Sequence, residues 1–306
     1  MFEIIFLSFF ALVWIIFASI EDLRKREIAN WLNFSLLIFA MGFRFFYSLF
    51  YSESFAFFYQ GLIGLGIFFV LGNLFYYGRT FAGGDAKLMI SLGAILPFSE
   101  SFLINIQIFG LFFILFLLIG AIYGTIWSIF LMVKDFKEFK KEFLRNFKRY
   151  RKIMYLIMFF GIILMVLGVI ESLFFIFGIL IFLLPYFYIY ARAVDDACMI
   201  KKVPTSKLTE GDWLYKDVKV GRKLIEFNWS GLTKSEINLL GKKYKTILIR
   251  QGVPFTPVFL FSFLILLFLY VFGFLDSLWN SFWYPGLFGK FFCFLRFNFF
   301  HFFLWF

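Results

Sequence analysis

The stretch FLINIQIFGLFFILFLLIGAIYGTIWSIFLMV, residues 102–133, carries no charged side chain and decides the fold class. About 20 apolar residues suffice for one membrane-spanning helix, so this run either tilts or extends beyond the bilayer. Shorter apolar runs flank it on both sides, at residues 2–20, 31–50, 56–77, 88–98, 153–170, 172–190 and 255–275. The sequence therefore predicts an all-α polytopic membrane protein with about eight transmembrane helices.

The composition of the whole chain excludes several other classes of protein. Of the 306 residues, 62% are hydrophobic and 16% are charged, whereas soluble domains average about half apolar and a quarter charged. A soluble enzyme, a disordered protein and a disulfide scaffold are excluded on this ground. Two cysteines, Cys198 and Cys293, and one histidine, His301, are too few for a cysteine or histidine metal cluster, so we expect no metal site.

The distribution of basic residues predicts the orientation in the membrane. With the N-terminus outside, 27 of the 30 Lys and Arg residues fall on the inner side, in segments 21–30, 78–87, 134–152 and 191–250. Inner loops of membrane proteins are enriched in Lys and Arg, so the net charge of +11 reflects orientation and no nucleic-acid partner is expected. Arg44, late in the second predicted span, is expected to reach the outer surface by snorkelling.

Composition divides the chain into five predicted segments. They are a membrane core at 1–133, a basic inner loop with two further spans at 134–190, a small cytoplasmic domain at 191–250, a last span at 251–275 and an aromatic tail at 276–306. The tail is broken by Pro285 and Gly286, so it is either a ninth span, an interfacial hairpin or a disordered appendage.

The polar segment 191–250 is predicted to form a small α+β domain on the inner face. Thr233 and Glu236 have the spacing of a capping box and predict the start of a short helix. Residues 220–225 and 246–249 are candidate strands. The domain either gates access to the membrane core or packs beneath the spans.

The basic run KDFKEFKKEFLRNFKRYRK, residues 134–152, is the longest charged stretch in the first half of the chain. It is interpreted as an inner loop or interfacial helix that contacts anionic membrane lipids. A docking surface for a substrate is the alternative.

Membrane orientation explains most charges in the chain, but it does not explain two aspartates. Asp22 lies in EDLRKREIAN, residues 21–30, directly after the first predicted span, and Asp85 lies in FAGGDAKL, residues 81–88, at the start of the fourth. Two spans separate them, so both return to the same membrane face. A carboxylate within the membrane raises the free energy of the protein, so its presence there indicates a function. Purely structural roles remain open, as a helix-end charge for Asp22 and an N-cap for Asp85.

A close carboxyl pair favours one kind of chemistry. Two neighbouring carboxyl groups do not ionise together easily, so they share one proton. The ionised partner can take a proton from water and the protonated partner can donate to a peptide carbonyl, which requires no metal or other cofactor. Gly83 and Gly84 leave the backbone before Asp85 open to close approach.

At these residues the chain resembles the type IV prepilin peptidase family of membrane aspartic peptidases, in particular its archaeal prepilin and preflagellin branch. The first motif reads EDLRKREIAN and the second, of the GxGD type, reads AGGDAKLMISLGA. LTEGDWLYKDV, GLTKSEINLL and QGVPFTPVFL are similar to the C-terminal region of the archaeal branch. The resemblance implies that Asp22 and Asp85 are catalytic, and that Gly83, Gly84 and Lys87 support the second motif or bind substrate.

The resemblance also implies the activity. Family members cut the leader peptide from pilin-like precursors at the cytoplasmic face of the cell membrane, so such precursors are the expected partners besides membrane lipids. Paired inner-loop cysteines and a glycine-rich methyl-donor motif are missing from the sequence, so peptidase activity without methyltransferase activity is expected.

Other functions remain open at this point. A cation- or proton-coupled transporter would use the paired aspartates for ions, and an inactive scaffold would not need them. A presenilin-like intramembrane protease would have a Tyr-Asp pair, whereas Glu21 precedes Asp22 here. The sequence does not indicate the oligomeric state or which precursor is cut.

Overall fold

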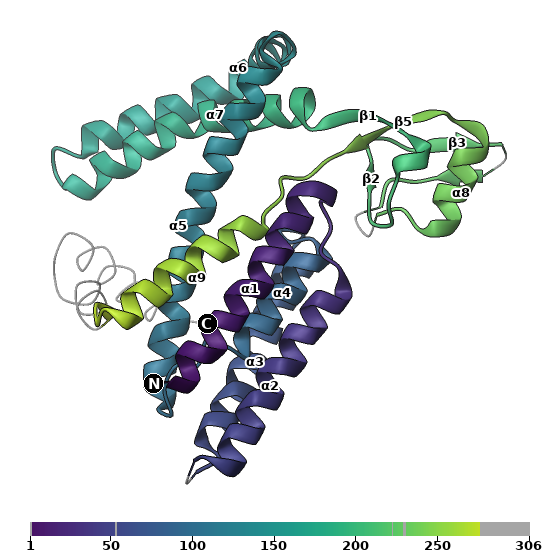
Figure 1. Cartoon of the computed structure of the whole chain (residues 1–306). Coiled ribbons are helices and arrows are strands. Elements are labelled where there is room, and N and C mark those ends of the chain that lie inside the picture. Colours follow the sequence, from purple (N-terminus) through teal and green to yellow (C-terminus); the bar gives the residue numbers. More distant parts are fainter. Residues whose placement is uncertain (1, 53, 222, 229–230, 276–306) are drawn as a thin grey trace, which may run out of the picture. The chain divides into compact units, whose positions relative to one another are not determined.

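The computed structural model describes residues 2–52, 54–221, 223–228 and 231–275 (Figure 1). The aromatic tail predicted at 276–306 lies outside these residues. The chain forms two compact units, one from residues 1–123 with 254–306 and the other from residues 124–253.

Six helices among the described residues are long and apolar enough to cross a membrane. They are α1 (Phe2–Lys25), α2 (Asn30–Phe50), α3 (Ala56–Tyr77), α5 (Phe102–Lys134), α6 (Phe136–Leu167) and α7 (Ser172–Cys198). The expected polytopic helical membrane protein is confirmed.

Two of the predicted spans correspond to shorter helices. Helix α4 (Gly83–Gly93) has 11 residues and α9 (Thr256–Val271) has 16. At 1.5 Å per residue these are about 16 and 24 Å long, less than the hydrocarbon core of about 30 Å. Helix α4 stops ahead of Pro97, because a proline has no N–H to donate to the carbonyl four residues back, which here is that of Gly93.

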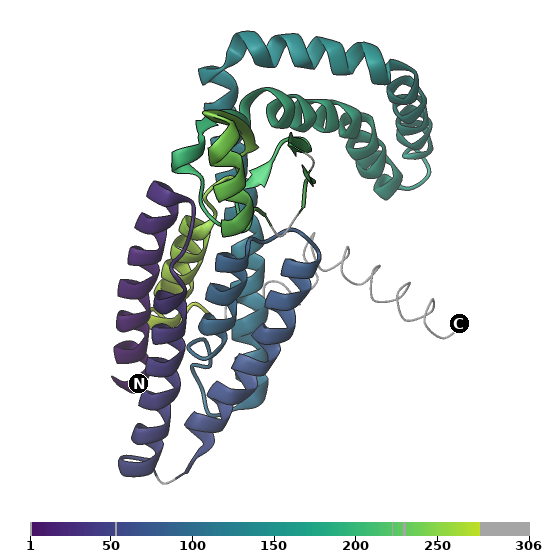
Figure 2. The same ribbon diagram turned by 90° about the vertical axis from the view of Figure 1, so that its right-hand side faces the viewer.

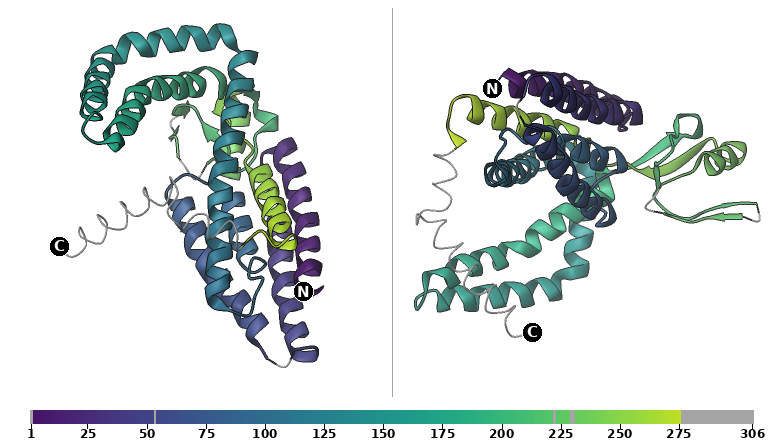
Figure 3. Two further views of the ribbon diagram at one scale, coloured as in Figure 1. Left: turned by 90° about the vertical axis from the view of Figure 1, so that its left-hand side faces the viewer. Right: turned by 90° about the horizontal axis from the view of Figure 1, so that it is seen from below.

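The first unit is a bundle built around α4. Helix α1 packs against α2 and α9, and α2 also contacts α3 and α4 (Figures 1 and 3). Helices α3 and α4 approach closely at Gly64 and Gly93, where a Cβ atom on Gly93 would lie 2.6 Å from the Gly64 carbonyl oxygen. Small residues allow such backbone contact between membrane helices. This contact fixes α4 within the bundle.

The expectation that Arg44 reaches the outer surface is wrong. Its side chain is fully buried. The guanidinium donates to the carbonyl oxygens of Ala94 at 2.7 Å, Ile95 at 3.1 Å and Pro97 at 2.7 Å, and to that of Phe57 at 2.8 Å. Carbonyls at the end of a helix lack intrahelical partners, and the planar fork of an arginine can satisfy several of them at once. Arg44 therefore holds the chain that leaves α4.

The second unit starts at Gly124, within α5, and contains the helical pair α6 and α7, which lie side by side (Figures 1 and 2). They approach at Gly161 and Gly178, where a Cβ on Gly161 would lie 3.0 Å from the Gly178 carbonyl oxygen. Helix α6 runs without a break from Phe136 to Leu167. From Phe136 onward, the basic run and the apolar run predicted behind it thus belong to one helix.

A small sheet domain follows α7. Strands β1 (Ile200–Pro204), β5 (Thr246–Arg250) and β2 (Trp213–Leu214) form an antiparallel sheet in the order β1-β5-β2, and β3 (Val218–Val220) pairs with β4 (Lys223–Ile225). A 3₁₀ turn, η1 (Thr205–Lys207), and helix α8 (Lys234–Lys243) complete it. Buried apolar side chains form its core: Leu208, Leu214, Ile225, Leu232, Leu240, Ile247 and Ile249. The predicted small α+β domain is confirmed.

Part of the local structure of this domain was predictable from the sequence. The capping box is present, because Glu236 N donates to Thr233 Oγ1 and the Glu236 carboxylate accepts from Thr233 N at 2.9 Å. The strand predicted at 246–249 is β5. The single strand predicted at 220–225 is wrong, because Gly221 adopts a φ of +62° and divides the segment into the hairpin β3–β4.

Candidate active site

Asp22 lies in the last turns of α1 on the side that faces the bundle. Ala11, Ile15 and Ala18 precede it at helical spacing, and all four side chains are buried. Only 7% of Asp22 is exposed. This burial distinguishes Asp22 from an ordinary solvated charge at a helix end.

The first motif continues as a tight connection from α1 to α2. Arg26 adopts a left-handed φ of +59°, and its backbone N–H donates to the Asp22 carbonyl at 2.8 Å. The Glu21 carboxylate accepts from the backbone N–H of Ala29 at 3.2 Å. The turn returns the chain into the bundle, where Ile28 is buried.

Asp85 is the third residue of α4. The N-cap position is taken by Ala82, so the structural alternative of Asp85 as N-cap is wrong. Its carboxylate reaches back to a backbone hydrogen bond with Ala82, as acidic side chains at this helix position do. Asp85 remains partly exposed, which leaves it accessible to a substrate or water.

The two glycines before Asp85 have different surroundings. A Cβ on Gly84 would lie 3.2 Å from Ile28 Cβ, whereas a Cβ on Gly83 would meet nothing nearer than Tyr76 Cε2 at 3.7 Å. The Gly84 carbonyl also accepts from Asn33 Nδ2 at 3.3 Å. Gly84 is therefore the point at which the two motifs pack together.

Lys87 also connects the two motifs. Its amine donates to Asn30 Oδ1, in the first residue of α2, at 2.6 Å. One turn further along α4, Ser91 Oγ donates to the Asn33 carbonyl at 3.0 Å. The contact found for Lys87 is thus with the first motif and not with Asp85.

Thr256, the first residue of α9, brings the two aspartates together. Its backbone N–H donates to Asp22 Oδ2 at 2.9 Å, and its hydroxyl donates to Asp85 Oδ1 at 3.5 Å. Thr256 is fully buried. The predicted pair Asp22 and Asp85 therefore meets at one residue from the far end of the sequence.

Sequence reasoning assigned no role to Thr256. It noted the segment QGVPFTPVFL only for its resemblance to a C-terminal region. One local signal is present, because Pro257 directly follows and proline is favoured in the first turn of a helix. That signal marks a helix start and does not identify a contact with residues more than 170 positions away.

Aromatic side chains hold the start of α9 in place. Phe81, just before the second motif, contacts Phe255 and Phe259, with ring centroids 6.1 and 6.0 Å apart. Phe116 of α5 contacts the same two rings, at 5.6 and 4.7 Å. These ring contacts hold the start of α9, and with it Thr256, against α5 and the residue before the second motif.

The surroundings of Asp85, which lies outside the six long helices, change its acidity. Burial, and then the negative charge of nearby Asp22, raise the pKa of Asp85 to about 7. A group with this pKa can hold a proton at neutral pH beside an ionised partner. The pair can therefore supply a general base and a general acid in one site.

The comparisons with known proteins give a family resemblance for part of the chain. Residues 9–129 match the sequence model of the type IV leader peptidase family. The expected family resemblance is confirmed. The matched segment contains both motifs and both aspartates, whereas Thr256 lies outside it.

One curated relative is similar to part of the chain. The preflagellin peptidase of Methanocaldococcus jannaschii is 34% identical over 85 residues. The match covers 28% of this chain and only 36% of that relative. No solved structure matches the chain.

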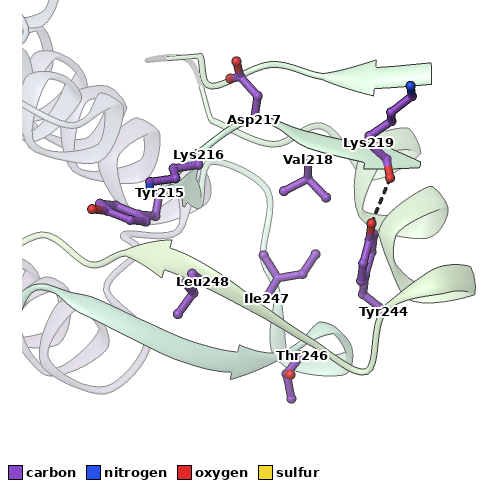
Figure 4. A pocket seen from close by; sticks show the side chains of 9 residues that line it. All are labelled: Tyr215, Lys216, Asp217, Val218, Lys219, Tyr244, Thr246, Ile247 and Leu248. Carbon is purple, nitrogen blue, oxygen red and sulfur yellow. Dashed lines mark hydrogen bonds between the residues drawn. The ribbon is translucent and has the colours of Figure 1, made fainter. Parts of the chain in front are cut away.

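The second unit contains a pocket of about 290 Å³ (Figure 4). On one side Tyr244 Oη donates to the Lys219 carbonyl at 2.8 Å. Among the described residues that line it, the one carboxylate is Asp217, which accepts from Phe227 N at 2.7 Å. The pocket thus lacks the acid pair found in the first unit.

No group of three or more His, Cys, Asp or Glu side chains suited to a metal ion occurs within the described part of the chain.

Proposed function

We propose that the protein is a membrane aspartic endopeptidase that removes the leader peptide of type IV pilin-like precursors, prepilins or preflagellins. The observation that supports this most directly is the meeting of Asp22 and Asp85 at Thr256, in a chain whose residues 9–129 match the leader peptidases. The proposed activity is proteolysis alone, without methyl transfer and without a cofactor.

The proposed mechanism uses the pair in unequal protonation states. Asp22, ionised, takes a proton from a water molecule while the water oxygen attacks the carbonyl carbon of the scissile bond. Asp85, protonated, gives its proton to the carbonyl oxygen, so the intermediate is a neutral diol. Asp22 then passes its proton to the departing amine, and Asp85 recovers a proton from the diol as the C–N bond breaks.

The proposed location of this chemistry is the cytoplasmic face of the cell membrane. Arg24, Lys25 and Arg26 lie within four residues of Asp22, and basic residues collect on the inner side of membrane proteins. In this arrangement the apolar segment of a precursor rests in the bilayer near α1 and α4. Its leader then extends into the inner aqueous phase.

Co-expression with candidate precursors tests the proposal. Loss of the leader, seen on a gel and by mass spectrometry of the new N-terminus, is expected with the wild-type protein. Asp22→Asn and Asp85→Asn should each abolish detectable cleavage, because an amide neither accepts nor supplies the required proton. Asp135→Asn, at a helix start where the side chain makes no capping hydrogen bond, is the matched control and should cleave normally.

The possible results separate the alternatives. Cleavage that persists in either active-site variant would contradict the aspartate pair. A well-folded wild-type protein that cleaves none of the precursors would favour a transporter or a scaffold instead.

A further inference from the structure

The start of α9 contributes two different hydrogen-bond groups to the aspartate pair. The backbone N–H of Thr256 donates to Asp22, and the hydroxyl of the same residue donates to Asp85 and also acts on Asp22. We propose that Thr256 is the positioning residue of the pair and assigns the two aspartates their separate roles. This inference rests on the proposed peptidase function and deepens it.

The contact with Asp22 favours its ionised form. The first N–H groups of a helix have no intrahelical partner and carry partial positive charge. In α9 the next residue is Pro257, which has no N–H to offer. An N–H group can only donate, so its bond to Asp22 at 2.9 Å is strongest when that carboxyl is charged. Thr256 thus selects Asp22 as the base.

The contact with Asp85 is of a different kind. A hydroxyl can donate to a carboxylate and can also accept from a protonated carboxyl. At 3.5 Å it lies at the outer limit of hydrogen bonding. The Thr256 hydroxyl can therefore hydrogen-bond to Asp85 in both protonation states of the reaction, which suits Asp85 to the role of the acid.

The position of Thr256 is fixed by its neighbours. Phe255 and Phe259, on either side of it, pack against Phe81 and Phe116. The residue itself is fully buried. Both contacts are therefore set by packing of α9 in the bundle, and the distance between the two carboxyl groups is set with them.

Other groups also act on Asp22: the Phe255 backbone hydrogen-bonds to its carboxylate, and Tyr123 of α5 lies within electrostatic reach of it. Arg26 acts on Asp22 from the end of α1, and the Lys87 amine is engaged by Asn30. Neither replaces a donor that serves both carboxyl groups. Of the described side chains, that of Thr256 is the one that hydrogen-bonds to Asp85, so loss of its hydroxyl acts on Asp85 directly.

The test uses Thr256→Val, which keeps the shape and the backbone N–H and removes only the hydroxyl. Full-length protein in lipid nanodiscs is assayed on a precursor peptide over a range of pH. We expect kcat to fall about tenfold or more with little change in KM. The falling limb of the pH–rate profile should move up by about half a pH unit or more, since Asp85 loses a donor to its charged form.

Two further variants separate positioning from packing. Thr256→Ser restores the hydroxyl and should retain kcat within about threefold and the wild-type pH profile. Ser262→Ala removes another fully buried hydroxyl of α9, which donates to the Val258 carbonyl, and should leave kcat and the pH profile unchanged. Should Thr256→Val fail to fold, Thr256→Ala gives the same comparison.

A second readout does not depend on activity. An apolar carbodiimide modifies protonated carboxyl groups, so its yield at Asp85, measured by mass spectrometry against pH, reports the protonation of that residue. The midpoint should be higher in Thr256→Val than in wild type and unchanged in Thr256→Ser. An unshifted midpoint overturns the inference even if no precursor is cleaved. Absence of cleavage together with a shifted midpoint overturns the proposed function alone.

Discussion

The two ends of α4 hold buried or partly buried charges in opposite ways. At the C-terminal end, the Arg44 guanidinium has four carbonyl partners within 3.1 Å and lies 4.2 Å from the Phe57 ring centroid. At the N-terminal end, Asp85 has a long contact to Thr256 and a second carboxylate nearby. The difference indicates that a charged group whose hydrogen-bonding capacity is filled stabilises the fold. A charged group with few hydrogen-bond partners remains available for catalysis.

The largest effect on stability is expected at the C-terminal end of α4, where Arg44 binds. Arg44→Met should lower the free energy of unfolding by about 3–5 kcal/mol, because it leaves several buried carbonyls without donors. Thermal unfolding of the purified protein in detergent measures the change. Arg24→Met, at an exposed position in the last turn of α1, is the control and should unfold like wild type. Equal stability of both variants would remove the distinction between the two ends.

The cleavage rate, which depends on Asp85 at the N-terminal end of α4, should respond to pH. Because the pKa of Asp85 is raised to about 7, the acid is protonated below that pH and lost above it. Cleavage should therefore decline about tenfold per unit as the pH rises beyond 7. Initial rates between pH 5 and 9, with recovery checked after return to pH 6, give the profile. A rate that stays flat to pH 9 would contradict the role of Asp85 as acid.

The same pKa has a consequence for stability. A carboxyl group that holds its proton more tightly in the folded protein than in the unfolded chain stabilises the fold most at low pH. The contribution of Asp85 should decrease as the pH rises from about 4 to about 7. Asp85→Asn should remove this dependence while the protein remains folded.

The smallest effect is expected where the two motifs touch. Gly83→Ala and Gly84→Ala gain the same helix propensity, so the difference between them isolates the clash with Ile28. Gly84→Ala should be less stable than Gly83→Ala by about 1 kcal/mol. Denaturation of the two variants side by side measures this difference. A Gly83→Ala variant as unstable as Gly84→Ala would show that the contact with Ile28 is not the limiting one.

Much of the site was predictable because it depends on local patterns. Asp22 and Asp85 stand out as carboxylates beside apolar runs, and the capping box at Thr233 needs only four consecutive residues. Thr256 was not predictable in this way, since its contacts join it to positions 234 and 171 residues away. Arg44 was placed wrongly for a similar reason, because its partners end a helix 50 residues further along the chain.

The sequence by itself determined that the chain is a polytopic membrane protein with two acidic motifs, because apolar length and charge follow directly from composition. Only the tertiary structure decided that α4 and α9 are short, that Arg44 is buried and that Thr256 joins the aspartates. The physical reason is that these features depend on which backbone and side-chain groups packing brings within hydrogen-bond reach, and periodicity along the chain carries no record of such partners.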